Sequence, residues 1–164
     1  MDDATLVPGV ARPTVRFERR LRRSPSAVWR ALTVREELES WFPCDVLVDE
    51  WKVGASLRFV FRAGEGPDLN GTVLEFDEPR ILAFEWGDEV LRFELTEVDG
   101  GTRLVFTDQL DATFAARNAA GWDVCLELLD GRTAPEDLWT ARFDRYVEAF
   151  EPAIGPQVGP PERP

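Results

Sequence analysis

The sequence predicts a single α+β domain in which an antiparallel sheet wraps around a carboxy-terminal helix. Its 164 residues have the length of one domain with one continuous core. Residues 44–110 alternate between polar and apolar side chains, which is the pattern of strands with one buried face. Segments with helical spacing precede and follow this stretch. Helices kept apart from a run of strands are typical of the α+β class.

The two ends of the chain differ from its middle. Residues 1–13 and 152–164 are rich in Pro, Gly or small residues and show no apolar periodicity. Segments of this kind rarely bury enough apolar surface to become ordered. We therefore expect two poorly ordered ends around one domain at residues 14–151.

A strand and two short helices are expected at the start of the domain. The strand covers residues 15–22, where apolar and charged residues alternate. Ser24 can cap the first helix, and Pro25 suits its first position because no N–H is needed there. The second helix is predicted by a capping box, in which the Thr33 hydroxyl and the Glu36 carboxylate would bond backbone N–H groups.

Six strands are expected between residues 44 and 110, because turn residues interrupt the alternation repeatedly. One face of these strands is apolar, and the other mixes charges that can pair across strands in water. The apolar face is predicted to hold Leu57, Phe59, Phe61, Leu74, Phe76, Leu82, Phe84, Trp86, Leu91, Phe93, Leu95, Leu104 and Phe106. With the first strand this gives a seven-stranded sheet that something must cover.

Two helices are predicted to provide that cover. Residues 114–129 have helical spacing, and Gly131 after them suits a left-handed cap. Thr133 and Glu136 form a second capping box before an amphipathic stripe that reaches Phe150. The longest helix is thus expected near the carboxy terminus.

Composition excludes several functions. The net charge of −12 opposes binding to nucleic acid or to anionic membranes, which need a basic surface. No apolar run approaches the roughly 18 residues of a membrane span. The chain has no histidine, which excludes Ser-His and Cys-His nucleophile pairs and most zinc sites. We accordingly expect neither a cofactor nor a bound metal.

The cysteines and the first residues indicate a compartment. Cys44 and Cys125 lie far apart in the sequence, and the amino terminus lacks the charged and apolar regions of a signal peptide. The protein is expected in the cytoplasm with both thiols reduced.

Several short segments occur in an order that resembles a known superfamily. They are Pro25 to Thr33, Glu37-Leu38, Trp41-Phe42, Gly71 to Glu75, Pro79, Leu82 to Trp86, Gly101 to Leu104 and Gly121-Trp122. From Val15 to Phe150 the chain resembles the START-like, polyketide-cyclase-like (SRPBCC) superfamily, in the branch of homologues of the activator of a heat-shock chaperone ATPase. The resemblance implies a helix-grip fold: an antiparallel sheet curls around a long carboxy-terminal helix, and two short helices close one end of a cavity.

The resemblance also implies a range of functions rather than one. Members bind lipids, sterols, hormones or polyketides, cyclise or dehydrate aromatic precursors, or contact chaperones, so function has to be argued from the site. In this fold, Trp29 is expected to pack as core under the end of the sheet. Trp41 and Phe42 are expected nearer the mouth of the cavity.

Two charged residues stand among apolar ones on the inner face. Arg19 interrupts the first strand, and Asp108 follows the apolar residues of the last. These strands are neighbours in the resembled fold, so the two side chains can pair there, and a buried charge needs a partner. Arg19 could instead hold a ligand carboxylate, enol or phenolate, or reach water at the end of the sheet.

Aromatic side chains of the inner face would line a pocket if the sheet stands away from the helix, and would be plain core otherwise. Gly121 could open space beside Trp122 or allow close helix contact. Cys125 could face the cavity, although a buried thiol without histidine is no expected nucleophile. The candidate ligand-binding residues are Arg19, Trp41, Phe59, Phe61, Phe84, Trp86, Phe93, Phe106, Asp108, Trp122 and Cys125. Asn118, Gln109 and Tyr146 could orient a ligand.

The sequence favours binding of a hydrophobic small molecule, aromatic, polyketide-like or lipid-like, in an internal cavity, with no catalytic residue assigned. One alternative is a cyclase or dehydratase in which Arg19 or Asp108 handles an enolate or a proton. Another is a chaperone cofactor or other protein-interaction module, whose partner the sequence does not identify.

Overall fold

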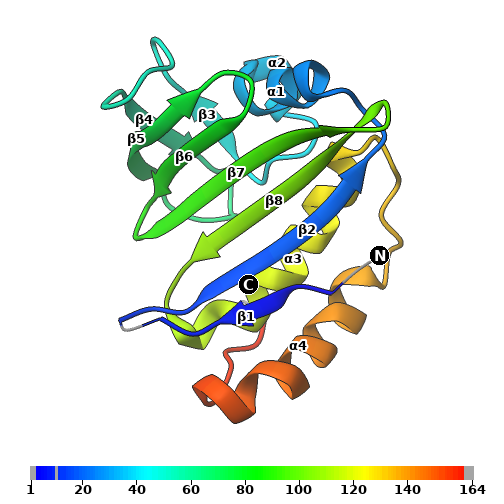
Figure 1. The fold of residues 1–164 in the computed structure, drawn as a ribbon. Helices are drawn as coiled ribbons and strands as arrows, with labels where there is room; N and C mark the ends of the chain where they lie inside the picture. Colours follow the sequence, from blue (N-terminus) through cyan, green and yellow to red (C-terminus); the bar gives the residue numbers. More distant parts are fainter. Residues whose placement is uncertain (1–2, 10, 161–164) are drawn as a thin grey trace.

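A curved antiparallel sheet and two long helices form the two layers of the computed structural model, which describes residues 3–9 and 11–160 (Figure 1). The strands are β1 (Thr5–Val7), β2 (Thr14–Leu21), β3 (Asp45–Leu47), β4 (Ser56–Val60), β5 (Leu69–Asp77), β6 (Ile81–Trp86), β7 (Glu89–Val98) and β8 (Gly101–Gln109). The helices are α1 (Pro25–Thr33), α2 (Arg35–Leu38), the short 3-10 helix η1 (Ala112–Phe114), α3 (Ala115–Leu129) and α4 (Leu138–Ile154).

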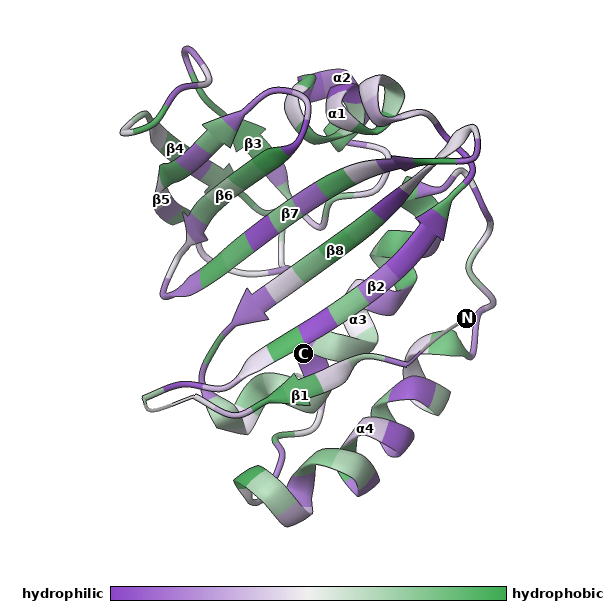
Figure 2. Cartoon of the chain, in the orientation of Figure 1, coloured by the Kyte–Doolittle hydropathy of each residue, from purple (hydrophilic) through white to green (hydrophobic). Residues whose placement is uncertain are grey.

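Strands β3 to β8 follow one another as a meander, and β2 and then β1 extend the sheet beyond β8. Their order across the sheet is β1-β2-β8-β7-β6-β5-β4-β3, and every neighbouring pair is antiparallel. Apolar and polar residues alternate along the strands, as the colours of β2, β7 and β8 show (Figure 2). This confirms the predicted α+β class and the sheet with one apolar face.

A row of phenylalanines crosses the inner face of the sheet. Phe17 of β2 stacks on Phe106 of β8 with ring centroids 5.7 Å apart, and Phe106 stacks on Phe93 of β7 at 4.6 Å. Phe93 continues to Phe84 of β6 at 6.2 Å, and Phe84 to Phe59 of β4 at 5.7 Å. All five rings are at most 3% exposed, so they form the centre of the core.

Helix α3 lies between the sheet and α4. Its Trp122 meets Phe106 across the interface, with ring centroids 4.9 Å apart. Four alanines of α3 are buried, and their small side chains let the neighbouring layers approach closely: Ala115, Ala116, Ala119 and Ala120. The sheet therefore grips α3, and α4 packs on the outer side of α3.

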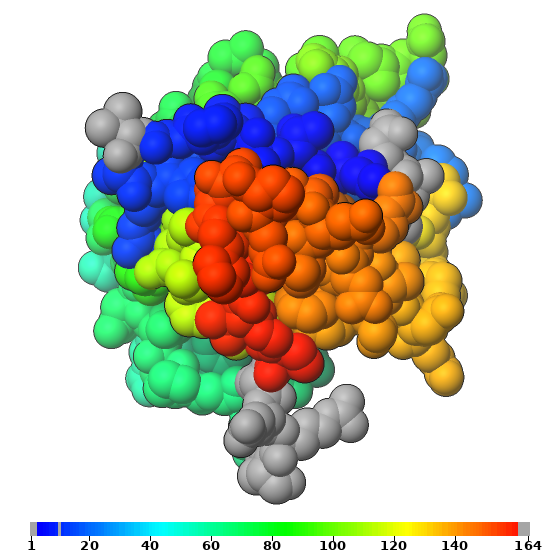
Figure 3. Space-filling model, turned by 90° about the horizontal axis from the view of Figure 1, so that it is seen from below, coloured from blue at the N-terminus to red at the C-terminus, as the bar shows by residue number. Residues whose placement is uncertain are grey.

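Both ends of the described chain are tied to the domain, where the sequence predicted poor order. Strand β1 pairs with β2, which makes the sheet eight-stranded rather than seven-stranded. Figure 3 shows α4, in orange and red, beside the blue amino-terminal segment, where Ala4 N donates to the Tyr146 hydroxyl. Beyond α4, Gln157 accepts a hydrogen bond from Ala116 N, and Val158 N donates to Thr113 O. Residues 161–164 lie outside the described part.

The short helices differ from expectation in their caps. Ser24 caps α1 as predicted, accepting from Ala27 N at 3.3 Å. The capping box predicted for α2 is not formed, because the Thr33 hydroxyl donates back to Trp29 O within α1. The box predicted at Thr133 is also wrong, since α4 begins only at Leu138.

A β-bulge changes which residues of β5 face inward. The register shifts between Val73 and Glu75, so Val73 is buried and Leu74 is exposed. The alternation predicted Leu74 on the inner face, and the extra residue of a bulge reverses that parity.

The tryptophans of the short helices are both buried. Trp29 packs against Phe76 with ring centroids 5.4 Å apart, at the end of the sheet, as expected. Trp41 is 3% exposed, donates its indole N–H to Ala31 O and meets Phe93, so it belongs to the core and not to a cavity mouth.

Candidate functional site

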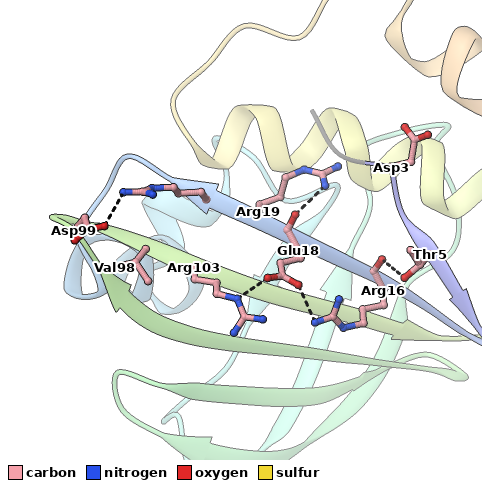
Figure 4. Close-up of a pocket in the computed structure, with 9 residues that line it drawn as sticks. Asp3, Thr5, Arg16, Glu18, Arg19, Val98, Asp99 and Arg103 are labelled. Carbon is pink, nitrogen blue, oxygen red and sulfur yellow. Dashed lines mark hydrogen bonds and ion pairs between the residues drawn. The ribbon is translucent and has the colours of Figure 1, made fainter.

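Two surface depressions of nearly equal volume are candidates for a site. The first, of about 500 Å³, lies on β2, β8 and the start of the chain (Figure 4). Its lining is almost entirely charged: Asp3, Thr5, Arg16, Glu18, Arg19, Arg20, Val98, Asp99 and Arg103. Glu18 bridges Arg16 at 3.1 Å and Arg103 at 2.6 Å. The chain's own carboxylates thus neutralise these arginines, which favours a surface ion-pair network over an anion site.

Arg19 points from β2 toward α3, in the direction visible in Figure 4, and enters a buried polar network. Arg19 Nη2 lies 2.5 Å from Asp123 Oδ1. The Tyr146 hydroxyl donates to Asp123 Oδ2 at 2.5 Å, and Arg142 Nε lies 3.6 Å from the same oxygen. Arg142 also pairs with Asp3. The network therefore joins β2, α3, α4 and the amino-terminal segment.

This network corrects the predicted contact between Arg19 and Asp108. Arg19 instead pairs with Asp123, a residue that the sequence analysis did not single out. Burial raises the pKa of Asp123, and the Tyr146 hydroxyl and the two arginines oppose that rise. Because every member has a partner inside the chain, the geometry indicates a structural role for Arg19.

The second depression, of about 490 Å³, opens between α3, α4 and the end of β6, and we call it the tryptophan pocket. Trp86, Trp122 and Trp139 supply its apolar walls. Gly121 of α3 leaves a gap between them, because a Cβ there would have only Trp139 Nε1 within 4 Å, at 3.9 Å. The full lining is Pro43, Trp86, Arg117, Asn118, Gly121, Trp122, Cys125, Glu136, Trp139, Thr140 and Pro160.

The core fixes the position of the innermost tryptophans. Trp86 and Trp122 lie with ring centroids 5.4 Å apart, and Phe42 contacts both, at 5.9 Å and 5.8 Å. The turn between α2 and β3 therefore supports the pocket walls through Phe42, whereas Trp41 packs against Phe93 in the core. Trp139 stacks on Phe143 at 5.0 Å on α4.

The thiols near the pocket are not activated. Burial raises the pKa of Cys44 to about 11, although the indole N–H of Trp86 opposes that rise. Burial likewise raises the pKa of Cys125 to about 12. Both side chains stay protonated near neutral pH, as expected for thiols without a basic neighbour.

Two carboxyl groups lie behind the pocket wall that α3 forms. Asn118 donates to Glu89 Oε1, and Trp122 Nε1 donates to Asp108 Oδ2 at 2.8 Å. Asp108 is fully buried, and its Oδ1 has no hydrogen-bond partner within the described part of the chain. The pocket and the carboxyl pair therefore share the side chains of Asn118 and Trp122.

Burial dominates the titration of this pair. It raises the pKa of Glu89 to about 9, and the charges of Asp108 and Asp88 add to the rise while Asn118 and Arg117 oppose it. Burial also raises the pKa of Asp108 to about 7, while the neighbouring Trp122 and Asn118 side chains oppose that rise. A carboxyl that is harder to ionise in the folded state holds a proton at neutral pH.

The raised pKa values predict that the free energy of unfolding falls as the pH rises. The folded state keeps protons that the unfolded chain releases above its ordinary pKa values of 4.5 for Glu89 and 3.8 for Asp108. The free energy of unfolding is expected to fall from about pH 4 to about pH 9. For each proton that the folded state retains, the fall is up to about 1.4 kcal/mol per pH unit. Urea unfolding at a series of pH values measures this slope. Glu89→Gln should flatten it above pH 7, whereas Glu97→Gln, an exposed change on the same strand, should not. A slope that Glu89→Gln leaves intact would contradict the assignment.

The candidate residues fall into distinct places. Trp86, Trp122 and Cys125 line the tryptophan pocket, and Asp108 lies behind Trp122. Phe61 is partly buried against Trp86, at 6.1 Å between ring centroids. The other aromatic candidates pack in the core: Trp41, Phe59, Phe84, Phe93 and Phe106.

Two residues of this region, Trp139 and Glu89, were not identified from the sequence as site residues, whereas Asn118 was named as a group that could orient a ligand. Trp139 was placed only on an amphipathic stripe. Glu89 could have been found, because it lies two residues before Leu91 and therefore on the same inner face of its strand. The neighbouring residues Gly87-Asp88 predicted a turn between two strands, and Glu89 follows that turn directly.

No helix within residues 3–9 and 11–160 combines the length and apolar character needed to cross a membrane. Within the same residues, no group of three His, Cys, Asp or Glu side chains is arranged to hold a metal ion.

Comparisons with known proteins agree on the fold. The family described as "Activator of Hsp90 ATPase homolog 1-like protein" matches residues 22–134. A conserved protein of unknown function from Enterococcus faecalis superposes with a TM-score of 0.75 at 25% identity, over 89% of each chain. CalU16 from Micromonospora echinospora superposes with a TM-score of 0.70 at 18% identity, over 93% of this chain and 97% of its own. A protein from Rhodobacter sphaeroides gives 0.63 at 25% identity, over 79% and 96%. No curated protein matches the sequence.

Proposed function

Because the chain belongs to the family of activator of Hsp90 ATPase homologue 1-like proteins, within the START-like superfamily, we propose that it binds a hydrophobic small molecule in the tryptophan pocket. The ligand is aromatic or polyketide-like, with flat apolar surface that matches the indole rings. Trp86, Trp122 and Trp139 are its main contacts, and Cys125 adds an uncharged edge. We place this activity in the cytoplasm, with both cysteines free.

The size and lining of the pocket carry this proposal. Its volume of about 490 Å³ lies within the range of small-molecule sites, which are mostly apolar with a few polar groups. Each Å² of apolar surface removed from water contributes about 25 cal/mol, so a two-ring ligand gains most of its affinity from the indoles. Offset or edge contacts between rings add about 0.5–1.5 kcal/mol for each aromatic pair.

The packing of the core supports the tryptophan pocket over a location beneath the sheet. The phenylalanine row fills the space where an internal cavity was expected, and each ring contacts its neighbour. The gap at Gly121 is instead open toward α4. The proposed ligand therefore lies beside α3 and not between α3 and the centre of the sheet.

Gly121→Leu tests the proposal, and we expect it to abolish binding while the protein remains folded. The new side chain would occupy the gap, and Leu is a better helix former than Gly by about 0.8 kcal/mol, which offsets any strain. The measurement is the rise of the melting temperature with the concentration of 2-acetylnaphthalene, a neutral two-ring probe.

Ala149→Leu is the matched control, since it adds the same side chain to an exposed position of α4 outside the pocket lining. The melting temperature of Ala149→Leu should rise with probe concentration as that of the wild type does. If Gly121→Leu folds and binds the probe as well as Ala149→Leu does, the tryptophan pocket is not the binding site.

A further inference from the structure

We propose that the tryptophan pocket takes aromatic acids, and that the ligand carboxylate lies against α3 between the guanidinium of Arg117 and the indole N–H of Trp139. The inference rests on the proposed function and specifies the chemical class of its ligand: flat aromatic rings that carry a carboxylate.

Arg117 is the cation of the pocket lining, and it has no carboxylate partner among the described residues. The chain offers many such partners, with 31 Asp and Glu against 19 Lys and Arg. The guanidinium carbon of Arg117 lies instead 5.0 Å from the centroid of the Phe114 ring, a cation–π contact. The side chain is therefore held at the pocket while its charge stays unpaired.

The indole N–H of Trp139 is a second donor at the same wall. Trp139 Nε1 lies 3.9 Å from the position that a Cβ of Gly121 would take, and it has no acceptor within the described part of the chain. Stacking on Phe143, at an interplanar angle of 10°, fixes the plane of this indole. A ligand oxygen slightly nearer to Trp139 than that Cβ position lies at the usual N–H···O distance of about 2.9 Å.

Helical spacing brings the two donors to one place. Arg117 and Gly121 are four residues apart on α3, so they share a face, with Cβ positions about 5–6 Å apart. Helical side chains lean toward the preceding turn, and Gly121 has none to cover the turn that carries Arg117. A carboxylate in this gap can accept from Arg117 with one oxygen and from Trp139 with the other.

The carboxyl groups of the protein leave this place to a ligand. Glu136 lines the pocket but is exposed to water at the rim. Glu89 lies behind α3, where it accepts from Asn118, and burial keeps its pKa at about 9 although Arg117 lowers it. Glu89 is thus protonated near neutral pH and does not neutralise Arg117. The first turn of α3 holds no acidic side chain, and this end of a helix favours an anion.

This arrangement discriminates between ligands with the same rings. A carboxylate forms charge-assisted hydrogen bonds with Arg117, which are roughly twice as strong as the neutral bonds that a ketone oxygen forms. The indole walls contribute equally to both ligands, since the buried apolar area is the same. The difference in affinity therefore reports the acid group alone.

The experiment compares 2-naphthoate with 2-acetylnaphthalene at pH 7 by quenching of tryptophan fluorescence. We expect the wild-type protein to bind the acid about tenfold more tightly, the equivalent of about 1.4 kcal/mol. The ratio of the two affinities should shrink between about 10 mM and about 1 M salt, because the Debye length falls from about 30 Å to about 3 Å.

Arg117→Gln removes the charge and keeps a polar side chain. It should weaken 2-naphthoate about tenfold and leave 2-acetylnaphthalene nearly unchanged. Arg62→Gln is the matched control, because Arg62 is exposed, lies outside the pocket lining and forms no ion pair among the described residues. This control alters the net charge equally and should bind both probes as the wild type does.

Trp139→Phe tests the second donor, since it keeps an aromatic ring and removes the indole N–H. It should weaken 2-naphthoate more than 2-acetylnaphthalene, because the bond to a charged acceptor is the stronger one. Gly121→Leu fills the gap and should abolish the binding of both probes.

The outcomes distinguish this inference from the proposed function. If the wild type binds 2-naphthoate no more tightly than the ketone, or if Arg117→Gln binds both probes as Arg62→Gln does, the acid site is wrong while binding in the pocket stands. Binding of 2-naphthoate that survives in Gly121→Leu places the acid elsewhere and also overturns the inference. If neither probe binds the wild type, the proposed function fails and this inference fails with it. Should Arg117→Gln not fold, as judged by circular dichroism, the salt series on the wild type decides, and a ratio that salt leaves unchanged contradicts the inference.

Discussion

Replacing Asp123 with Ala is expected to lower the free energy of unfolding by about 3–5 kcal/mol, the usual cost of removing one partner of a buried ion pair. Asp123 is fully buried, and it accepts from Arg19 and Tyr146 at 2.5 Å each. Its loss leaves Arg19 and Arg142, whose side chains are 10% and 8% exposed, without the charge between them.

The effect is large because four parts of the chain meet at this carboxylate. Asp123 belongs to α3, Arg19 to β2, and Tyr146 and Arg142 to α4. The Tyr146 hydroxyl also accepts from Ala4 N, which holds the start of the chain. The pKa of Asp123 is nevertheless raised by burial, so the net gain from the network is smaller than the cost of breaking it.

Urea unfolding with linear extrapolation measures the loss. Tyr146→Phe removes one hydroxyl and should cost about 1–3 kcal/mol. Asp144→Ala, at an exposed position of α4, provides the surface control and should stay within about 0.5 kcal/mol. If Asp123→Ala costs no more than Asp144→Ala, the network does not hold the layers together.

The fold could be predicted because its signals are local. Six strands between residues 44 and 110 follow from period-two alternation and from turn residues, and the structure has these strands. Ser24 and Pro25 predicted the start of α1 correctly. Leu74 was misplaced because a bulge shifts the parity of β5, and nothing in the alternation indicates one.

The ends of the chain could not be predicted because tertiary contacts order them. A segment of three residues, 5–7, is too short to show a pattern, yet β1 forms through pairing with β2 and the bond between Ala4 and Tyr146. Gln157 and Val158 are ordered by hydrogen bonds to η1 and α3 in the same way. Partners so distant in sequence leave no periodic signal.

The candidate site could be predicted only in part, for the same reason. Trp86, Trp122 and Cys125 were identified from strand parity and helical spacing, and they line the tryptophan pocket. The partner of Arg19 could not be identified, because Asp123 reaches it from another layer. Whether an aromatic residue packs in the core or lines a pocket depends on the distance between the sheet and the helices. The alternation of residues along a strand does not reveal that distance.

Phe106→Ala is expected to cost about 3–5 kcal/mol of unfolding free energy, since it removes a central ring from the phenylalanine row. Phe106 is 0% exposed and has ring contacts at 4.6 Å with Phe93, 5.7 Å with Phe17 and 4.9 Å with Trp122. The surrounding rings belong to different strands and α3, so they cannot close the space without moving the backbone.

Trp139→Ala is the opposite case, and the two variants together separate core from pocket. Trp139 is only partly buried, at the pocket rim, so its truncation should lower the free energy of unfolding by less than Phe106→Ala does. It should, however, weaken the binding of 2-acetylnaphthalene at least about tenfold, as loss of an aromatic anchor does. Urea unfolding and probe titration on both variants provide the comparison. If Phe106→Ala instead unfolds at nearly the wild-type urea concentration, the inner face is not close-packed. An internal cavity among the phenylalanines, as the sequence suggested, would then replace the tryptophan pocket as the place where a ligand binds.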